Sequence, residues 1–102
     1  MKPGAVASEV DAILRQGAIA AGLREDYANI TGYTLGYYSR QPLRSSDFTR
    51  CFMPGARWRL EPGMVFHMYT SARGVSFSET VLVAAAGPER LTRIERRLFS
   101  KA

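Results

Sequence analysis

The chain has 102 residues, with 14 Lys and Arg against 9 Asp and Glu, and a formal net charge of +5. This length suits one small domain or part of a larger one, and 46% hydrophobic residues argue against a disordered segment. One cysteine, Cys51, excludes an internal disulfide framework and a multi-cysteine zinc site, and it favours a reducing, cytoplasmic compartment. Apolar runs are too short to span a membrane and no signal-peptide pattern is seen, so we expect no membrane partner.

Residues 8–21 are predicted to form an amphipathic helix. Apolar and small side chains recur there at helical spacing and predict one buried stripe: Val10, Ile13, Leu14, Gly17, Ala18 and Ala21. Ser8 is expected to cap the helix, with Asp11 in a shortened capping box, and Gly22 is expected to end it. A stripe of small residues suits close packing on a sheet.

The next part of the chain lacks a helical pattern. Residues 29–35 are rich in β-branched and aromatic side chains and predict a short strand. Residues 38–58 contain prolines, a glycine and several arginines without periodicity, which predicts a long loop with one short strand near 48–53. A loop of that length is often functional.

Two alternating segments, 64–70 and 75–84, predict the main strands of an antiparallel sheet. Alternation places His67 and Tyr69 on the face opposite Phe66 and Met68. Shorter features complete the prediction: turns at 61–63 and 87–88, a returning strand at 89–92 and a short helix at 94–98. The fold class is α+β, with one amphipathic helix packed on an antiparallel sheet.

The candidate site residues lie on these two strands. His67, Tyr69, Ser78 and Glu79 could converge on one sheet surface if the strands pair, although alternation puts Ser78 and Glu79 on opposite faces. Two competing interpretations assign no function: His67 is a buried, hydrogen-bonded strand histidine, or the polar side chains simply cover a solvent-exposed face of the sheet. No cluster at metal-ligand spacing is seen, and Cys51 has no neighbouring base in sequence.

The positive charge is almost all arginine. It is concentrated in residues 40–59 and in the C-terminal residues 90–97. A nucleic-acid reader would need a basic stripe with interleaved aromatics, for which Tyr37-Tyr38-Ser-Arg40 is a weak signal. We therefore expect a solvated loop and tail, and regard nucleic-acid binding as an unfavoured alternative.

Five segments in order resemble the C-terminal part of the creatinase/aminopeptidase ("pita-bread") superfamily. These segments are Lys2-Pro-Gly-Ala-Val-Ala-Ser-Glu-Val-Asp11, Thr31-Gly-Tyr-Thr-Leu-Gly36, Leu60-Glu-Pro-Gly-Met-Val-Phe66, Gly74-Val-Ser-Phe-Ser-Glu-Thr-Val-Leu-Val83 and Gly87-Pro-Glu-Arg-Leu-Thr92. The resemblance implies that residues 1–92 form the C-terminal half of such a domain, with a partial pita-bread fold, and that residues 93–102 form a basic tail.

The resemblance also implies that the usual metal ligands are replaced. Relatives carry a histidine ligand after the first glycine of the second motif, where this chain has Tyr33. Relatives also carry a glutamate ligand on each of the two main strands, and this chain has Tyr69 and Ser78 at those positions. In relatives the second glutamate is followed by an acidic or amide residue, which here is Glu79. Two further aspartate ligands of relatives come from an upstream half of the domain that has no counterpart in this chain. A two-metal site needs bridging carboxylates, so we expect no metal ion and no cofactor.

This replacement pattern is similar to the Xaa-Pro peptidase and ectoine-hydrolase-like branch. It implies His67, Glu79 and Tyr33 as catalytic candidates, with His67 as the proton shuttle, and Tyr69 and Ser78 as substrate contacts. The implied function is that of a truncated hydrolase whose full-length relatives cleave a C–N bond in a small amide or dipeptide.

We expect the isolated chain to be inactive and to associate with itself or with a complementary N-terminal half, since half a domain exposes apolar surface. The alternative is a non-catalytic binding or assembly module that retains half of the fold.

Overall fold

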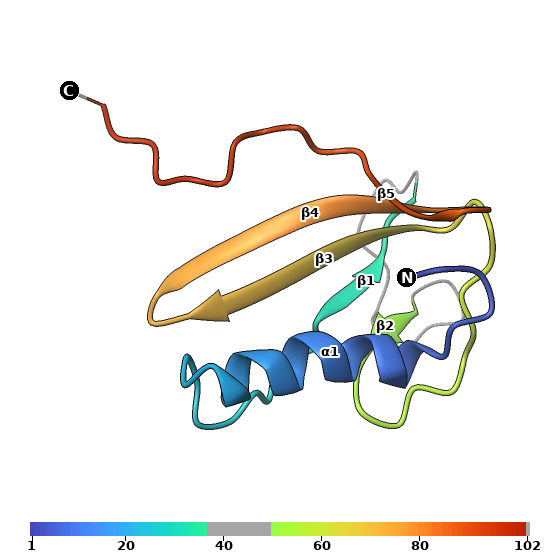
Figure 1. Ribbon diagram of the computed structural model, residues 1–102, viewed down its shortest axis with the longest axis horizontal. Helices are drawn as coiled ribbons and strands as arrows, with labels where there is room; N and C mark the ends of the chain where they lie inside the picture. The colour runs from blue at the N-terminus through green and yellow to red at the C-terminus, as the bar shows by residue number, and fades with distance from the viewer. Residues whose placement is uncertain (37–49, 102) are drawn as a thin grey trace.

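The computed structural model describes residues 1–36 and 50–101, and it places one helix against a five-stranded antiparallel sheet (Figure 1). The sheet order is β2-β1-β3-β4-β5, and the bounds of the elements are α1 (Ala7–Ala20), β1 (Gly32–Thr34), β2 (Cys51–Phe52), β3 (Val65–Ala72), β4 (Val75–Ala84) and β5 (Gly87–Arg90). The predicted α+β arrangement is confirmed. No helix in these two ranges is long and apolar enough to cross a membrane.

Helix α1 begins one residue before the predicted start. Val6 precedes it in an extended conformation without a side-chain cap, so the expected capping by Ser8 is wrong. The predicted end is confirmed: Gly22 has φ +70°, and the amide of Leu23 donates to the carbonyl of Ala18, which closes a Schellman turn.

The buried side of α1 also differs from the predicted stripe. Ile13 is 73% exposed, whereas Asp11 is only 1% exposed. The helix therefore turns toward the sheet the side that carries Ala7, Val10, Asp11 and Ala18. A charged side chain can lie there only because it is fully paired, as described below.

Strands β3 and β4 form a long hairpin. Its register pairs Ala72 with Val75, leaving Arg73 and Gly74 as a two-residue turn. Both turn residues have positive φ, 52° and 80°, as in a type I′ turn. The predicted strand at 75–84 has the observed bounds, and the strand predicted at 64–70 runs from 65 to 72.

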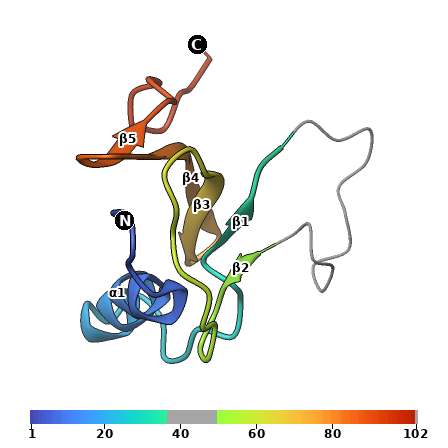
Figure 2. The same cartoon turned by 90° about the vertical axis from the view of Figure 1, so that its right-hand side faces the viewer.

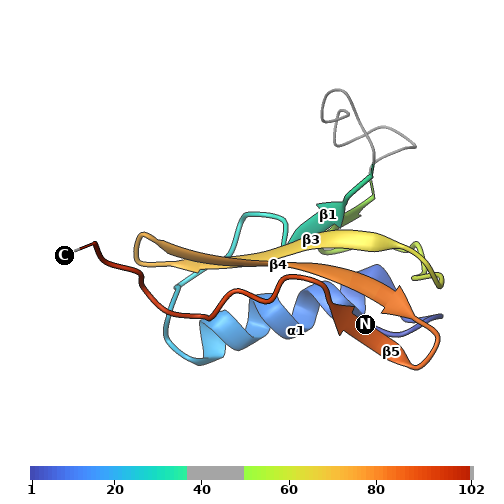
Figure 3. The same cartoon turned by 90° about the horizontal axis from the view of Figure 1, so that it is seen from above.

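Three shorter predictions need correction. Gly87 and Pro88 lie in β5, and the turn before that strand is at residues 85–86. Residues 94–98 form no helix; the segment after β5 runs back past β4 toward the hairpin end (Figure 3). The strand predicted at 29–35 is limited to β1. The loop predicted at 38–58 lies mostly outside the described residues, and β2 is the short strand expected near 48–53.

The core lies between α1 and one face of the sheet (Figure 2). Its fully buried aromatic pair is Phe52 and Phe66, whose ring centroids are 4.8 Å apart at an interplanar angle of 81°. The other members of the cluster are aliphatic or small: Ala7, Val10, Leu60, Met68 and Val83. This face of β3 and β4 therefore supplies the packing, which leaves the opposite face available for other contacts.

Candidate functional site

The sheet face that points away from α1 carries four of the predicted site residues. Tyr33 of β1 pairs with His67 of β3, and Tyr69 of β3 pairs with Ser78 of β4, so all four project to the same side. Together with Ser76 they line a hollow of about 240 Å³. Ser76 was not predicted, although its position two residues before Ser78 on an alternating strand places it on this face.

Three of these side chains form an aromatic cluster. The Tyr33 and His67 rings meet edge to face with centroids 5.0 Å apart, and the His67 and Tyr69 rings stack at 5.2 Å. Tyr33 and Tyr69 are 6.2 Å apart. The imidazole thus contacts both phenol rings, and these contacts restrain its orientation beside the hollow.

The electrostatics of His67 favour its neutral form. Partial burial lowers the pKa of its imidazole below the ordinary value of 6.5. At neutral pH the ring therefore has a nitrogen lone pair that can accept a proton. The neighbouring phenol of Tyr33 can donate a hydrogen bond, so this face provides both a proton acceptor and a neutral donor.

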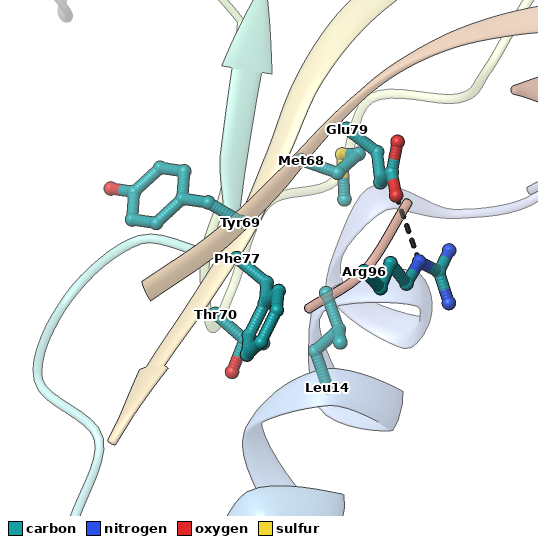
Figure 4. A pocket seen from close by; sticks show the side chains of 7 residues that line it. All are labelled: Leu14, Met68, Tyr69, Thr70, Phe77, Glu79 and Arg96. Atoms are coloured by element: carbon teal, nitrogen blue, oxygen red, sulfur yellow. Dashed lines mark hydrogen bonds and ion pairs between the residues drawn. The ribbon is translucent and has the colours of Figure 1, made fainter. Parts of the chain in front are cut away.

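Glu79 does not share this face. Glu79 pairs with Met68 and lines another hollow, of about 370 Å³, between the sheet and α1. The Tyr69 ring points away from Glu79 (Figure 4). Its carboxylate accepts hydrogen bonds from the hydroxyl of Thr92 and, at 2.8 Å, from Nε of Arg96. These contacts lower the pKa of Glu79, and they anchor the C-terminal segment to the sheet.

The two catalytic candidates His67 and Glu79 therefore lie on opposite faces of the sheet, as strand alternation indicates for Ser78 and Glu79. Strand alternation separates them, and no bulge in β4 interrupts its regular pairing with β3. The expected convergence of His67, Tyr69 and Ser78 is observed, and Tyr33, a candidate implied only by the resemblance, lies beside them.

A buried ion pair positions the strand that carries Tyr33. Arg15 contacts both carboxylate oxygens of Asp11 at 2.7 and 2.9 Å, and the Thr31 hydroxyl donates to Asp11 at 2.7 Å. Arg15 also donates to the carbonyls of Tyr27 and, at 2.8 Å, Asn29. The helix thus binds the segment that leads into β1 two residues before Tyr33.

Close approach between β1 and β3 also contributes to the site. A Cβ on Gly32 would lie 2.5 Å from Sδ of Met68 and 2.8 Å from the carbonyl oxygen of His67, which is closer than real Cβ atoms come. Gly32 therefore lets β1 pair tightly with β3, and this pairing sets Tyr33 against His67.

Comparison with known proteins identifies the family. Residues 1–85 match metallopeptidase family M24. The chain belongs to this family. It is 30% identical over 99 residues to the Xaa-Pro dipeptidases of Pyrococcus horikoshii and Pyrococcus furiosus. The match covers 96% of this chain and 27% and 28% of those proteins, so the chain spans about a quarter of the curated relatives it matches.

Solved structures agree on the fold. The dipeptidase PepE from Mycobacterium ulcerans superposes with a TM-score of 0.75 at 24% identity, over 95% of this chain and 26% of that one. A recombinant prolidase from Thermococcus sibiricus gives 0.74 at 26% identity, over 96% of this chain and 26% of that one. The chain therefore has the fold of part of these pita-bread enzymes.

The family name implies a metal centre, but the side chains on the open face do not fit one. Tyr33, Tyr69 and Ser78 present neutral hydroxyls, and His67 is the one group among the four that commonly ligates a transition metal. Glu79 lies on the other face. Across residues 1–36 and 50–101, no group of three His, Cys, Asp or Glu side chains could hold a metal ion.

Proposed function

We propose that the open face of this chain is the substrate-binding and proton-transfer wall of a hydrolase that cleaves a C–N bond in a small amide or dipeptide. The observation that carries the proposal is the aromatic cluster of Tyr33, His67 and Tyr69 over a hollow, in a chain that belongs to a peptidase family. Its curated relatives are Xaa-Pro dipeptidases.

Each residue has a role that follows from its chemistry. Neutral His67 accepts a proton from an attacking water and returns it to the leaving nitrogen. Tyr33 donates a hydrogen bond to the carbonyl oxygen of the scissile bond, where negative charge develops. Tyr69 and Ser78 contact the substrate on either side of this pair. No step is assigned to a metal ion.

The residues on this face also favour one branch of the superfamily. Tyr33, Tyr69 and Ser78 stand where the resemblance implies metal ligands. We propose that the chain corresponds to the C-terminal part of the domain and is similar to the ectoine-hydrolase-like members. The buried thiol of Cys51 is compatible with a cytoplasmic location, which stays a prediction.

The wall needs further polypeptide to become a closed site. Large apolar side chains are exposed on both the helix and the sheet, including Ile13 at 73% and Phe77 at 47%. A second copy or a complementary half of the domain would cover them, and the chain by itself would bind substrate without hydrolysing it. Size-exclusion chromatography that shows only a monomer, together with no binding of an apolar dye, would contradict this assembly.

The experiment uses His67 as a natural probe because it is the one histidine of the chain. Its imidazole proton resonances are therefore assigned without ambiguity. Titration with an Ala-Pro dipeptide at pH 7 should shift these resonances in a saturable way and should change the pKa obtained by NMR titration. The variants Tyr33→Phe and Tyr69→Leu should weaken the binding.

The control variant is Arg57→Gln, an exposed position outside the hollow. It should bind the dipeptide as the unmodified chain does. A dipeptide that leaves the His67 resonances unchanged at every concentration would overturn the proposal. Hydrolysis that requires a divalent metal and survives His67→Gln would overturn it as well.

A further inference from the structure

A second hollow lies at the tip of the β3–β4 hairpin. Its volume is about 420 Å³, and its lining residues come from the hairpin tip and from the segment after α1: Arg24, Asn29, Ser71, Ala72, Arg73, Gly74, Val75 and Ser76. The tip and the C-terminal end of α1 lie at the same end of the molecule (Figure 1). Two arginines and three neutral polar side chains line it, and none of the lining residues is acidic.

The two guanidinium groups are held from different sides. Arg24 stacks over the Tyr27 ring at 4.3 Å, and its Nη1 lies 3.4 Å from the Ser71 hydroxyl. Arg73 reaches the carbonyl of Gly22 at 3.4 Å through one Nη. Each guanidinium has five N–H donors, so these long contacts leave several donors of each group available.

The positive charge is not neutralised locally. Within the described ranges, no carboxylate lies at ion-pair distance from Arg24 or Arg73, although Glu25 and Asp26 follow Arg24 in sequence. By contrast, Arg15, Arg90 and Arg96 each have a carboxylate partner. The hollow is therefore a place where an anion would find donors and positive charge together.

Backbone conformation adds an independent observation. Arg73 has φ 52°, the one non-glycine residue with positive φ among those described. Asn, Asp and Gly are preferred at this position of a type I′ turn because other residues are strained there. Arginine at this point is a poor choice for the turn, which suggests that its side chain serves another purpose.

We infer that Arg24 and Arg73 form an oxyanion-binding site that takes a carboxylate or phosphate group. Ser76 lines both this hollow and the hollow lined by Tyr33 and His67, so the two are neighbours on one sheet face. That a single ligand occupies both hollows rests on the proposed function; anion binding at the hairpin tip does not.

The test is a titration of the full chain with inorganic phosphate and, separately, with acetate, at constant ionic strength. The backbone amides of Arg73 and Gly74 should shift in a saturable way in ¹H–¹⁵N spectra. Stronger binding of phosphate would assign the site to phosphate-bearing ligands, and stronger binding of acetate to carboxylates. Either result supports the oxyanion site.

Arg73→Asn is the decisive variant because asparagine suits the turn. It should raise the urea midpoint of unfolding and yet weaken anion binding about fivefold or more, the effect of losing one charge-assisted hydrogen bond. Arg24→Lys, which keeps the charge and loses the planar fork, should weaken binding too. Arg57→Gln removes one charge elsewhere on the surface and should change the affinity by less than about twofold.

Three outcomes would overturn the inference. The tip amides could fail to respond to either anion, or Arg57→Gln could weaken binding as much as Arg73→Asn does. Arg73→Asn could also lower the urea midpoint without changing anion affinity, which would assign Arg73 to fastening the hairpin to Gly22. Titration with neutral acetamide, read at the His67 resonances, tests the proposed function separately.

Discussion

The two faces of the sheet are built from alternate residues of the same strands, yet they have different properties. On the side of α1, Phe66 and Met68 are buried in the core, and Glu79 is bound by the C-terminal segment. On the open side, His67 stacks on Tyr69, Tyr69 pairs with Ser78, and all three line a hollow.

This division separates stability from chemistry within single strands. A residue that fills the core has little freedom to change, because its volume is fixed by its neighbours. A residue one position along the strand faces the open side and can be selected for its hydrogen bonding and proton affinity. Substitutions on the two faces should therefore differ in both size and kind of effect.

The largest contrast is expected between two adjacent residues of β3. Phe66→Ala should lower the free energy of unfolding by about 4 kcal/mol, because it opens a cavity in the core. His67→Ala should lower it by less than about 1 kcal/mol, since only partial packing is lost. Urea unfolding followed by circular dichroism measures both. Similar losses for the two variants would show that the faces are not distinct.

Asp11→Ala tests how the helix supports the open face. It leaves Arg15 without its carboxylate partner and removes the acceptor of the Thr31 hydroxyl, and it should destabilise the fold by about 3 kcal/mol. Glu25→Ala, at an exposed position, should change stability by less than about 0.5 kcal/mol. An Asp11 variant as stable as the Glu25 variant would rule out a supporting ion pair.

Two glycines give a smaller, opposite pair of effects. Gly32→Ala should destabilise the fold by about 2 kcal/mol and displace Tyr33, because its Cβ would meet the carbonyl oxygen of His67. Gly17→Ala, inside α1 with open space around it, should stabilise the fold by about 0.7 kcal/mol. The midpoints of thermal unfolding and the chemical shifts of His67 report the two results. A tolerated Gly32→Ala would mean that β1 can move away from β3 without loss.

The smallest expected effects are changes in stability with pH, and the group on each face titrates in its own pH range. His67 has a folded pKa below 6.5, so the unfolded chain takes up a proton first and stability falls as the pH drops below 6.5. Glu79 has a folded pKa below 4.5, so its contribution is present above that value and is lost on further acidification. Plots of the free energy of unfolding against pH should lack the decrease below pH 6.5 in His67→Gln and the decrease at more acidic pH in Glu79→Gln. Loss of both decreases in one variant would contradict separate faces.

The sequence alone predicted much of this comparison. Alternation over residues 64–70 and 75–84 assigned His67 and Tyr69 to one face and Phe66 and Met68 to the other, because side chains in a strand have a strict period of two. The end of α1 was also predictable, since Gly22 supplies the positive φ that a Schellman turn requires.

Features that depend on distant partners could not be predicted. Asp11 was interpreted as part of a cap, and its burial depends on Thr31, which lies 20 residues away in the sequence. The helix expected at 94–98 is absent because five residues cannot stabilise an isolated helix, and Glu79 binds Arg96 from the sheet instead. The left-handed Arg73 contradicts ordinary turn preferences, so the hairpin tip was not recognised as a turn.

The sheet ends at β5 with Pro88, which pairs with Val83 and has no amide hydrogen. A proline in an outermost strand removes a donor that another polypeptide would need to continue the ladder, and Glu89 and Arg90 add charge to the same margin. Lengthening of the sheet past β5 is thereby disfavoured, so a neighbouring molecule that approaches this margin has little backbone to engage.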